Sequence, residues 1–306
     1  MSYTRLSILN AMLVLMLFFF STTIDSDRGI ASPSLRPAEK KEKVGLNEVS
    51  RRRAPPELSA ESYVVRIIGE ETPLLSRRSD KPLPPASLTK LMTAAIAFEG
   101  LAPDQPILLS RDAKNVEEKT SGAAAGEVFS RDGAIKMALI SSANDAALAL
   151  ADETGRKRGA YDFSSALARF VETMNQYARA QGLRATNFVN PTGLDMEGHH
   201  ASADDIARLM EYLWNRHPRL LEFSRTIETS VLSRQGYNHK VSNTNDLLKE
   251  FPAILGSKTG FTDAAQGALA LWYPASDRRV ALVVLLGSPD RFKDGKRVLR
   301  WLEDVF

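Results

Sequence analysis

The 306-residue chain contains no cysteine and only four histidines. The absence of cysteine excludes disulfides, thiolate zinc sites, iron–sulfur clusters and cysteine nucleophiles. The histidines are not spaced as in the helical His-x-x-x-His or His-Glu-x-x-His motifs of zinc sites, and we interpret them as loop or surface residues. They are His199, His200, His217 and His239. We therefore expect no metal ion and no other cofactor.

A strong excess of charge of one sign is also lacking. Apolar residues make up 43% of the chain and charged residues 25%, so a disordered or fibrous protein is not expected. The net charge of +3 is concentrated in residues 36–53, which carry +4, whereas residues 54–306 carry −1. No nucleic-acid partner is therefore expected. We interpret the three arginines at 51–53 as solvated linker charges.

Long apolar runs are confined to the N-terminus. Residues 6–20 are apolar except for Ser7 and Asn10, and Arg5 precedes them. As a helix this run spans about 22 Å, which is short of the roughly 30 Å hydrocarbon core, and extension to residue 24 gives about 28 Å. We expect residues 1–31 to be a cleaved signal peptide or, alternatively, an inner-membrane anchor through residues 6–24.

Both alternatives place the rest of the chain in the periplasm or another extracytoplasmic compartment. Residues 32–60 are poor in aromatic residues and rich in serine, proline, lysine and arginine, which predicts a flexible basic linker. Residues 61–306 are then the folded domain. Their length is ample for a substantial hydrophobic core.

Strand-like patterns lie at the two ends of this domain, and helix-like patterns lie between them. A β-branched run at 63–68 precedes a turn, and two further strand-like runs, 268–273 and 279–286, flank a Pro-Ala-Ser-Asp turn. Helical periodicity marks residues 87–98, 133–154, 161–181, 203–214 and 291–306. We predict an α+β fold in which the two ends form an antiparallel sheet around a helical insertion.

Three short motifs carry groups that can do chemistry together. In the first, Ser87 and Lys90 are three residues apart, so a helix places the hydroxyl and the amine on one face. A serine hydroxyl needs a base, and a lysine can serve where burial or a nearby cation lowers its pKa. A serine at the start of a helix also gains from the positive end of the helix dipole. Alone, this spacing occurs about once by chance in a chain of this length.

The other two motifs lie later in the chain. The hydroxyl of Ser142 could relay a proton, and the amide of Asn144 could position a lysine amine or a substrate carbonyl. In Lys258-Thr259-Gly260, a lysine beside a hydroxyl can hold a carboxylate, and a glycine lets a substrate backbone approach closely. The three motifs occur in this order, 55 and then 116 residues apart.

Together they are the Ser-x-x-Lys, Ser-x-Asn and Lys-Thr-Gly set of penicillin-interacting serine enzymes. The chain resembles the D-alanyl-D-alanine carboxypeptidases, which are low-molecular-weight penicillin-binding proteins, over about residues 60–306. The segments that carry the resemblance are 85–94, 141–147, 187–195, 242–248 and 256–265. The resemblance implies a β-lactamase/transpeptidase-like fold, in which helices flank an antiparallel sheet. It also implies that residues 61–306 are a serine D,D-peptidase domain.

The resemblance further implies an acylation–deacylation cycle on peptidoglycan stem peptides. Ser87 would attack the carbonyl between two D-alanines, and Lys90 would take its proton. Ser142 would pass a proton to the leaving amine, while Asn144 would orient Lys90 and the substrate. A β-lactam would imitate the D-Ala-D-Ala end and trap Ser87 as a stable ester.

The resemblance also implies that the third motif binds the substrate. Lys258 and Thr259 would hold the terminal carboxylate, and Gly260 would let the substrate approach. Lys258 would also help to lower the pKa of Lys90. The backbone N–H groups of Ser87 and Phe261 would form the oxyanion hole.

Three alternatives stay open from the sequence. The first is a D,D-endopeptidase of the same family, which cuts cross-links instead of terminal D-alanine. A β-lactamase is the second, and Glu211 with Asn215 has a spacing like that of a water-activating pair, although we interpret both as structural. The third is a peptidoglycan-binding module without activity, which the intact Ser87 and Lys90 argue against.

Overall fold

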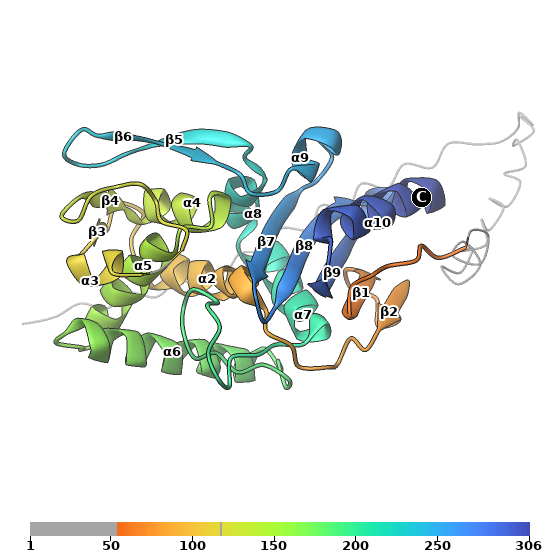
Figure 1. The fold of residues 1–306 in the computed structure, drawn as a ribbon, viewed down its shortest axis with the longest axis horizontal. Coiled ribbons are helices and arrows are strands. Elements are labelled where there is room, and N and C mark those ends of the chain that lie inside the picture. Colours follow the sequence, from red (N-terminus) through yellow and green to blue (C-terminus); the bar gives the residue numbers. More distant parts are fainter. Residues whose placement is uncertain (1–53, 117) are drawn as a thin grey trace, which may run out of the picture. The chain divides into compact units, whose positions relative to one another are not determined.

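A computed structural model describes residues 54–116 and 118–306 (Figure 1). The expected signal peptide or anchor, 1–31, and the larger part of the expected linker, 32–60, lie outside the described residues. Within the described part, no helix is long and apolar enough to cross a membrane. The assignments of residues 1–31 and 6–24 therefore stay predictions.

The two ends of the described chain form a five-stranded sheet in which every pair is antiparallel. The first strand pairs with the last, Tyr63 lying opposite Leu285. The prediction that the two ends join in one antiparallel sheet is confirmed. In spatial order the strands are β2 (Leu75–Arg77), β1 (Ser62–Ile67), β9 (Val280–Ser288), β8 (Gln266–Pro274) and β7 (Gly256–Thr262).

Helices cover both faces of this sheet, and most of them belong to the insertion between β2 and β7 (Figure 1). The longer helices are α2 (Lys90–Gly100), α4 (Arg131–Ile140), α5 (Asn144–Lys157), α6 (Phe163–Ala180), α7 (Ala203–Arg216), α8 (Pro218–Arg225) and α10 (Arg291–Val305). The short helices are α3 (Arg111–Lys114) and α9 (Leu247–Glu250). Two small ribbons pair β3 (Pro106–Leu108) with β4 (Val128–Ser130), and β5 (Glu228–Leu232) with β6 (Asn238–Ser242).

The alternation of side chains along β8 builds two cores. Ala270 and Trp272 point into the core on the side of the helical insertion, whereas Leu269 and Leu271 point into the core beneath α10. Because side chains alternate across a strand, a central strand buried on both faces is apolar at nearly every position. This pattern explains why residues 268–273 form an uninterrupted apolar run.

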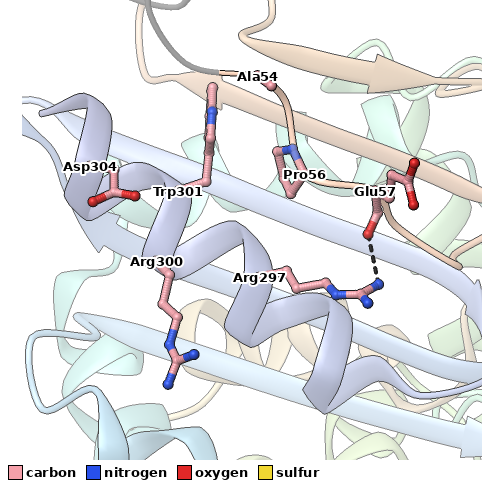
Figure 2. A pocket seen from close by; sticks show the side chains of 7 residues that line it. All are labelled: Ala54, Pro56, Glu57, Arg297, Arg300, Trp301 and Asp304. Carbon is pink, nitrogen blue, oxygen red and sulfur yellow. Dashed lines mark hydrogen bonds between the residues drawn. The ribbon is translucent and has the colours of Figure 1, made fainter.

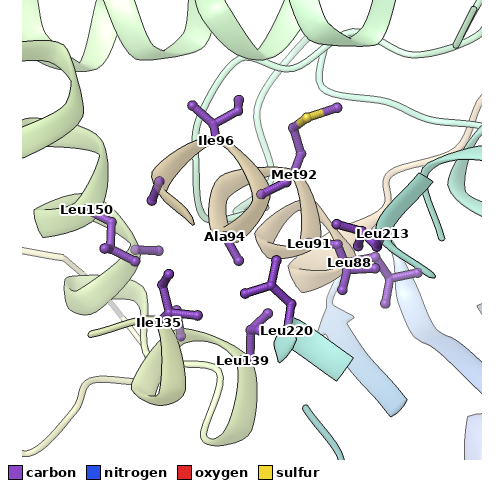
Figure 3. Packing of buried hydrophobic residues seen from close by; sticks show 14 of the residues in the cluster. Leu88, Leu91, Met92, Ala94, Ile96, Ile135, Leu139, Leu150, Leu213 and Leu220 are labelled. Carbon is purple, nitrogen blue, oxygen red and sulfur yellow. The ribbon is translucent and has the colours of Figure 1, made fainter. Parts of the chain in front are cut away.

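Helix α2 runs through the middle of the larger core (Figure 3). Residues 90–97 are all buried, so this helix is enclosed on every side. Its neighbours are α4, α5, α7 and α8, whose labelled side chains in Figure 3 are Ile135, Leu139, Leu150, Leu213 and Leu220. A helix enclosed in this way is a rigid support for a residue at its start.

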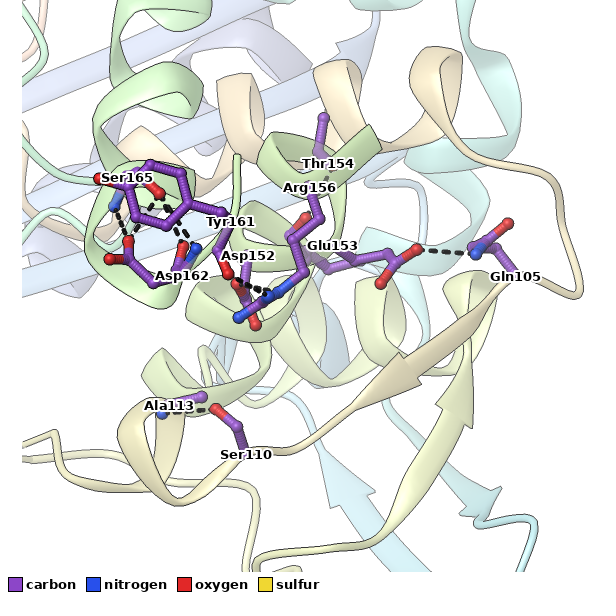
Figure 4. Close-up of polar contacts among 11 residues, drawn as sticks. Gln105, Ser110, Ala113, Asp152, Glu153, Thr154, Arg156, Tyr161, Asp162 and Ser165 are labelled. Carbon is purple, nitrogen blue, oxygen red and sulfur yellow. Dashed lines mark hydrogen bonds and ion pairs between the residues drawn. The ribbon is translucent and has the colours of Figure 1, made fainter. Parts of the chain in front are cut away.

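Side-chain caps set the start of several helices (Figure 4). The Ser110 hydroxyl accepts from the backbone N–H of Ala113 at the start of α3. At α6 the Asp162 carboxylate accepts from the backbone N–H of Ser165, whose hydroxyl lies 3.2 Å from the backbone nitrogen of Asp162. Such reciprocal bonds satisfy donors that a helix end otherwise leaves open.

The last residues of the expected linker pack into the fold. Leu58 and Ala60 are buried, and the backbone N–H groups of Ser59 and Ala60 each donate to the Asp294 carboxylate at 2.9 Å. Asp294 also accepts from the Ser59 and Ser288 hydroxyls, at 2.8 and 2.7 Å. This fully buried carboxylate therefore ties the first described segment to α10 and β9.

Replacing Asp294 with alanine should lower the free energy of unfolding by about 3 kcal/mol or more, because it leaves several buried donors without an acceptor. Urea denaturation would measure the change. Asp290→Ala is the matched control, since Asp290 is exposed and its side chain makes a single capping bond to the Lys293 N–H, for which about 1 kcal/mol is expected. Equal losses for the two variants would contradict the assignment.

A hollow of about 600 Å³ lies between residues 54–57 and the outer side of α10 (Figure 2). Its walls include Arg300, Trp301 and Asp304, and the Arg297 guanidinium donates to the Glu57 carbonyl at 2.8 Å. Because α10 covers one face of the sheet and the segment of Ser87 packs on the other, this hollow is separate from the three motifs.

Candidate active site

Ser87 lies in a tight turn that leads into α2. The turn is a 3-10 helix, Ala86–Thr89, and α2 begins at Lys90. The expectation that Ser87 opens the α-helix is wrong in this detail. Its hydroxyl is 2.9 Å from the Lys90 Nζ, so the expected meeting of hydroxyl and amine is present.

Two glycines allow neighbouring segments to close on this turn. A Cβ at Gly260 of β7 would lie 2.9 Å from the backbone nitrogen of Ser87, and one at Gly193 would lie 1.9 Å from the carbonyl oxygen of Ala86. Gly193 also has a φ of +87°, which disfavours other residues. Ala86 itself has a φ of +47°, so the backbone just before Ser87 is strained.

The Lys90 amine is fully buried and has three acceptors. It donates to the Ser87 hydroxyl at 2.9 Å, to the Asn144 Oδ1 at 2.7 Å and to the carbonyl of Thr192 at 2.7 Å. Burial lowers the pKa of Lys90 from its ordinary 10.5 to about 7, and repulsion from Lys119 adds to this effect. A large share of the amine is therefore neutral at neutral pH and can accept a proton.

Ser142 and Asn144 lie at a break between two helices. The sequence predicts one helical region over 133–154, whereas the structure ends α4 at Ile140 and starts α5 at Asn144. Ser142 has a φ of +62°, which an α-helix does not allow. The break directs its hydroxyl to the Lys258 Nζ, 2.9 Å away, and the Asn144 amide to Lys90.

Lys258 is buried in β7, where its amine donates to Ser142 and to the carbonyl of Thr259 at 2.8 Å. Burial and repulsion from Lys90 hold the pKa of Lys258 well below its ordinary value. The Thr259 hydroxyl lies 2.5 Å from the hydroxyl of Thr244. The Phe261 side chain is half exposed.

The structure thus brings the three motifs together through two sets of hydrogen bonds. One set links Ser87 and Asn144 through the Lys90 amine, and the other links Ser142 to Lys258. Gly260 packs on the Ser87 turn, and Thr259 and Phe261 lie next to it on β7. These residues, far apart in the sequence, could together activate a hydroxyl and bind an anion beside it.

Two cations near the site belong to no sequence motif, so the sequence gives no signal for them. Lys119 is exposed on the segment before β4, and its carbonyl accepts from the Asn144 N–H at 2.8 Å. Arg291, the first residue of α10, has its guanidinium carbon 5.8 Å from the centre of the Phe261 ring. Repulsion from Lys119 and Arg291 contributes to the lowered pKa of Lys258. Repulsion from Lys119 also adds to the effect of burial on the pKa of Lys90.

Two of the histidines that we interpret as loop or surface residues lie outside helices and strands, as expected for loop residues, but they are buried. His199 lies in a loop but is buried between the Thr89 hydroxyl and the backbone of Val189. His217 is buried at the junction of α7 and α8, where it lies 2.6 Å from the Glu99 carboxylate. In residues 54–116 and 118–306, no group of three or more His, Asp or Glu side chains is placed to hold a metal ion.

Glu211 does not belong to the site. Its carboxylate pairs with Arg66 of β1 and accepts from the backbone N–H of Gly69. This supports the structural interpretation of Glu211 and removes the main sequence argument for a β-lactamase.

Fold and motifs together define the class of protein. The structure of the Streptomyces K15 DD-transpeptidase superposes with a TM-score of 0.75 at 19% identity, covering 82% of this chain and 100% of that one. A D-alanyl-D-alanine carboxypeptidase DacD from Francisella tularensis gives a TM-score of 0.72 at 24% identity, covering 82% and 71%. The α+β, transpeptidase-like fold is therefore confirmed.

The family model of the D-alanyl-D-alanine carboxypeptidases matches residues 49–288, and the chain belongs to this family. It is 29% identical over 259 residues to the D-alanyl-D-alanine carboxypeptidase DacF of Bacillus subtilis, covering 82% of this chain and 63% of that protein. It is 34% identical over 255 residues to a D-alanyl-D-alanine endopeptidase of Pseudomonas aeruginosa, covering 81% and 78%. The chain thus spans less than two thirds of the length of DacF.

Proposed function

We propose that the protein is a serine-type D-alanyl-D-alanine carboxypeptidase that acts on peptidoglycan stem peptides and is inhibited by β-lactams. The observation that carries the proposal is the contact between the Ser87 hydroxyl and a buried Lys90 amine whose pKa is about 7. A hydroxyl and a base in hydrogen-bond contact are what an acyl-transfer enzyme needs in order to form a covalent intermediate.

In the acylation step, the Ser87 oxygen attacks the carbonyl carbon of the penultimate D-alanine while its proton passes to the Lys90 amine. The C–N bond then breaks, and the leaving D-alanine takes a proton through the Ser142 hydroxyl, which lies beside the second amine, Lys258. Asn144 holds Lys90 throughout. Water then hydrolyses the ester on Ser87 and restores the enzyme.

The terminal carboxylate of the substrate would bind at β7. The Arg291 guanidinium supplies positive charge on this side of Ser87, and the Lys258 amine and the Thr259 hydroxyl supply donors. Gly260 leaves room for a peptide backbone next to the turn. The backbone N–H groups of Ser87 and Phe261 are our candidates for the oxyanion hole.

Replacing Lys119 with glutamine should raise the pKa of Lys90, because it removes a cation that disfavours the charged amine. Acylation needs the neutral amine, so the acid limb of the pH–rate profile should move to higher pH. Stopped-flow acylation by a penicillin between pH 5 and 9 would measure the shift. Because Lys119 is exposed, the shift should shrink in 1 M salt, where the Debye length is about 3 Å.

Glu118→Gln is the matched control for Lys119→Gln. Glu118 raises the pKa of Lys90, so removal of its charge should move the acid limb to lower pH. Shifts in the same direction for both variants would contradict the electrostatic explanation.

The second candidate is a D,D-endopeptidase, which the relative from Pseudomonas aeruginosa favours, since it is named as one and is matched over 78% of its length. The chemistry at Ser87 is the same for both. The two activities differ in whether the leaving amine belongs to a terminal D-alanine or to a cross-linked neighbour. Either substrate implies work outside the cytoplasm, with residues 1–31 as the proposed signal peptide or membrane anchor.

The test is digestion of purified muropeptides followed by mass spectrometry. Release of D-alanine from pentapeptides would support the carboxypeptidase, and conversion of cross-linked dimers into monomers would support the endopeptidase. Prior treatment with a penicillin should block either reaction. Rapid turnover of the penicillin, or no reaction with any of these compounds by folded protein, would contradict the proposal.

A further inference from the structure

The loop between α6 and α7 supplies one acceptor of the Lys90 amine from its own backbone. The carbonyl of Thr192 accepts from the Lys90 Nζ at 2.7 Å. A carbonyl oxygen cannot adjust as a side chain can, so its position depends on how the whole loop is held. Any residue that fixes this loop therefore also fixes part of the surroundings of the amine.

His199 joins this loop to the turn that carries Ser87. Its side chain is 5% exposed, and its Nε2 lies 2.9 Å from the hydroxyl of Thr89, which stands between Ser87 and Lys90. Its Nδ1 lies 3.0 Å from the backbone nitrogen of Val189. Since a backbone N–H can only donate, Nδ1 is the unprotonated nitrogen, and Nε2 donates to Thr89.

The surroundings keep this imidazole neutral. Burial and the neighbouring His200 lower the pKa of His199 to about 4, against the opposing effect of Asp195. The tautomer that bridges Thr89 and Val189 therefore persists at neutral pH. A charged imidazole would turn an Nδ1–H toward the N–H of Val189, where two donors would face each other.

Further hydrogen bonds fix Thr192 within the loop and hold the other end of the loop against β7. The Asn190 side-chain oxygen accepts from the N–H groups of Thr192 and Gly193, at 3.1 and 2.7 Å. Beyond Gly193, the Asp195 carboxylate accepts from the Thr262 hydroxyl at 2.7 Å, at the end of β7. The loop is thus held at His199 against the Ser87 turn and at Asp195 against β7.

We propose that His199 is a positioning residue for acylation: its imidazole joins Thr89 to Val189 and so holds the Thr192 carbonyl against the Lys90 amine. The role rests on the proposed function, in which Lys90 is the base. His199 acts through the loop and does not take part in proton transfer.

The test is the rate of acylation by a penicillin as a function of pH, measured on folded protein. His199→Ala should acylate about 10- to 100-fold more slowly, the loss expected from a misplacement of about 1 Å. Its acid limb should move to lower pH, because the charged Lys90 loses one acceptor. The other titratable groups that face Lys90 are Lys119, Glu118, Asp145 and Lys258, and all are unchanged in this variant.

Two conservative variants each keep one of the two hydrogen bonds of His199. They also keep the proposal testable if His199→Ala does not fold. His199→Gln keeps an N–H donor for Thr89, and His199→Asn keeps an acceptor for Val189. Each should recover part of the rate lost in His199→Ala. Recovery by neither, with all variants folded, would overturn the bridging role.

Asn187→Ala is the control for simple destabilisation. The Asn187 amide donates to the carbonyl of Gly198 in the same loop at 2.8 Å without contacting Thr89. Its loss should lower Tm and leave the pH profile of acylation in place. Two results for His199→Ala would overturn this proposal alone. One is a wild-type rate and pH profile, and the other is a loss of rate that its lower Tm fully explains. A wild-type protein that forms no penicillin adduct would overturn the proposed function and this role with it.

Discussion

Ser87→Ala should abolish covalent labelling by a fluorescent penicillin and should lower the rate of D-alanine release by about 10⁶-fold, as expected for removal of a catalytic nucleophile. The physical reason is that the oxygen that forms the ester is gone, while the Lys90 amine keeps Asn144 and the Thr192 carbonyl as acceptors. The fold should therefore persist. Gel fluorescence and intact-protein mass spectrometry would measure the adduct.

Ser165→Ala is the matched control for Ser87→Ala, because it makes the same chemical change at the start of α6. It should label as the wild type does. A penicillin adduct of undiminished yield on Ser87→Ala would place the nucleophile at another residue.

Lys90→Ala should slow acylation by about 10³-fold, the contribution that a general base typically makes. The nucleophile is intact in this variant, so that a trace of labelling should survive. The pH profile gives the sharper result. In the wild type, acylation should fall as the pH drops through about 7, where Lys90 becomes charged, and in Lys90→Ala this limb should be absent.

Lys90→Met separates the loss of the amine from the loss of packing, because methionine keeps much of the aliphatic stem in this buried site. It should be as slow as Lys90→Ala and more stable. Lys296→Ala is the control, since Lys296 pairs with Glu250 at the surface, and it should behave as wild type. Rapid labelling of Lys90→Met would refute the assignment of Lys90 as the base.

The sequence by itself determined the parts of the site that depend on spacing within one turn of chain. Ser87 and Lys90 are three residues apart, and any helical turn brings such a pair together, so their contact followed without knowledge of the fold. The α+β class also followed from the sequence. Strand-like patterns mark both ends of the domain, and the burial of one or two faces of a strand is visible in the apolar pattern of that strand's own residues.

The break at Ser142 was decided by tertiary structure. Residues 133–154 have a helical pattern with no proline inside it, and nothing local predicts a φ of +62°. The strained backbone is held by contacts distant in sequence, among them the bond from Lys258 to the Ser142 hydroxyl and the bond from the Asn144 N–H to the carbonyl of Lys119.

Charge and burial around the amine were likewise decided by packing. Lys119 and Arg291 belong to no motif in the sequence, and only the paths of two segments bring them to the site. His199 looks like one of an exposed pair, yet the closure of the α6–α7 loop on the Ser87 turn buries it. Local sequence thus determined which groups could react, and the packing of distant segments determined their protonation and orientation, since both depend on neighbours that sequence spacing does not specify.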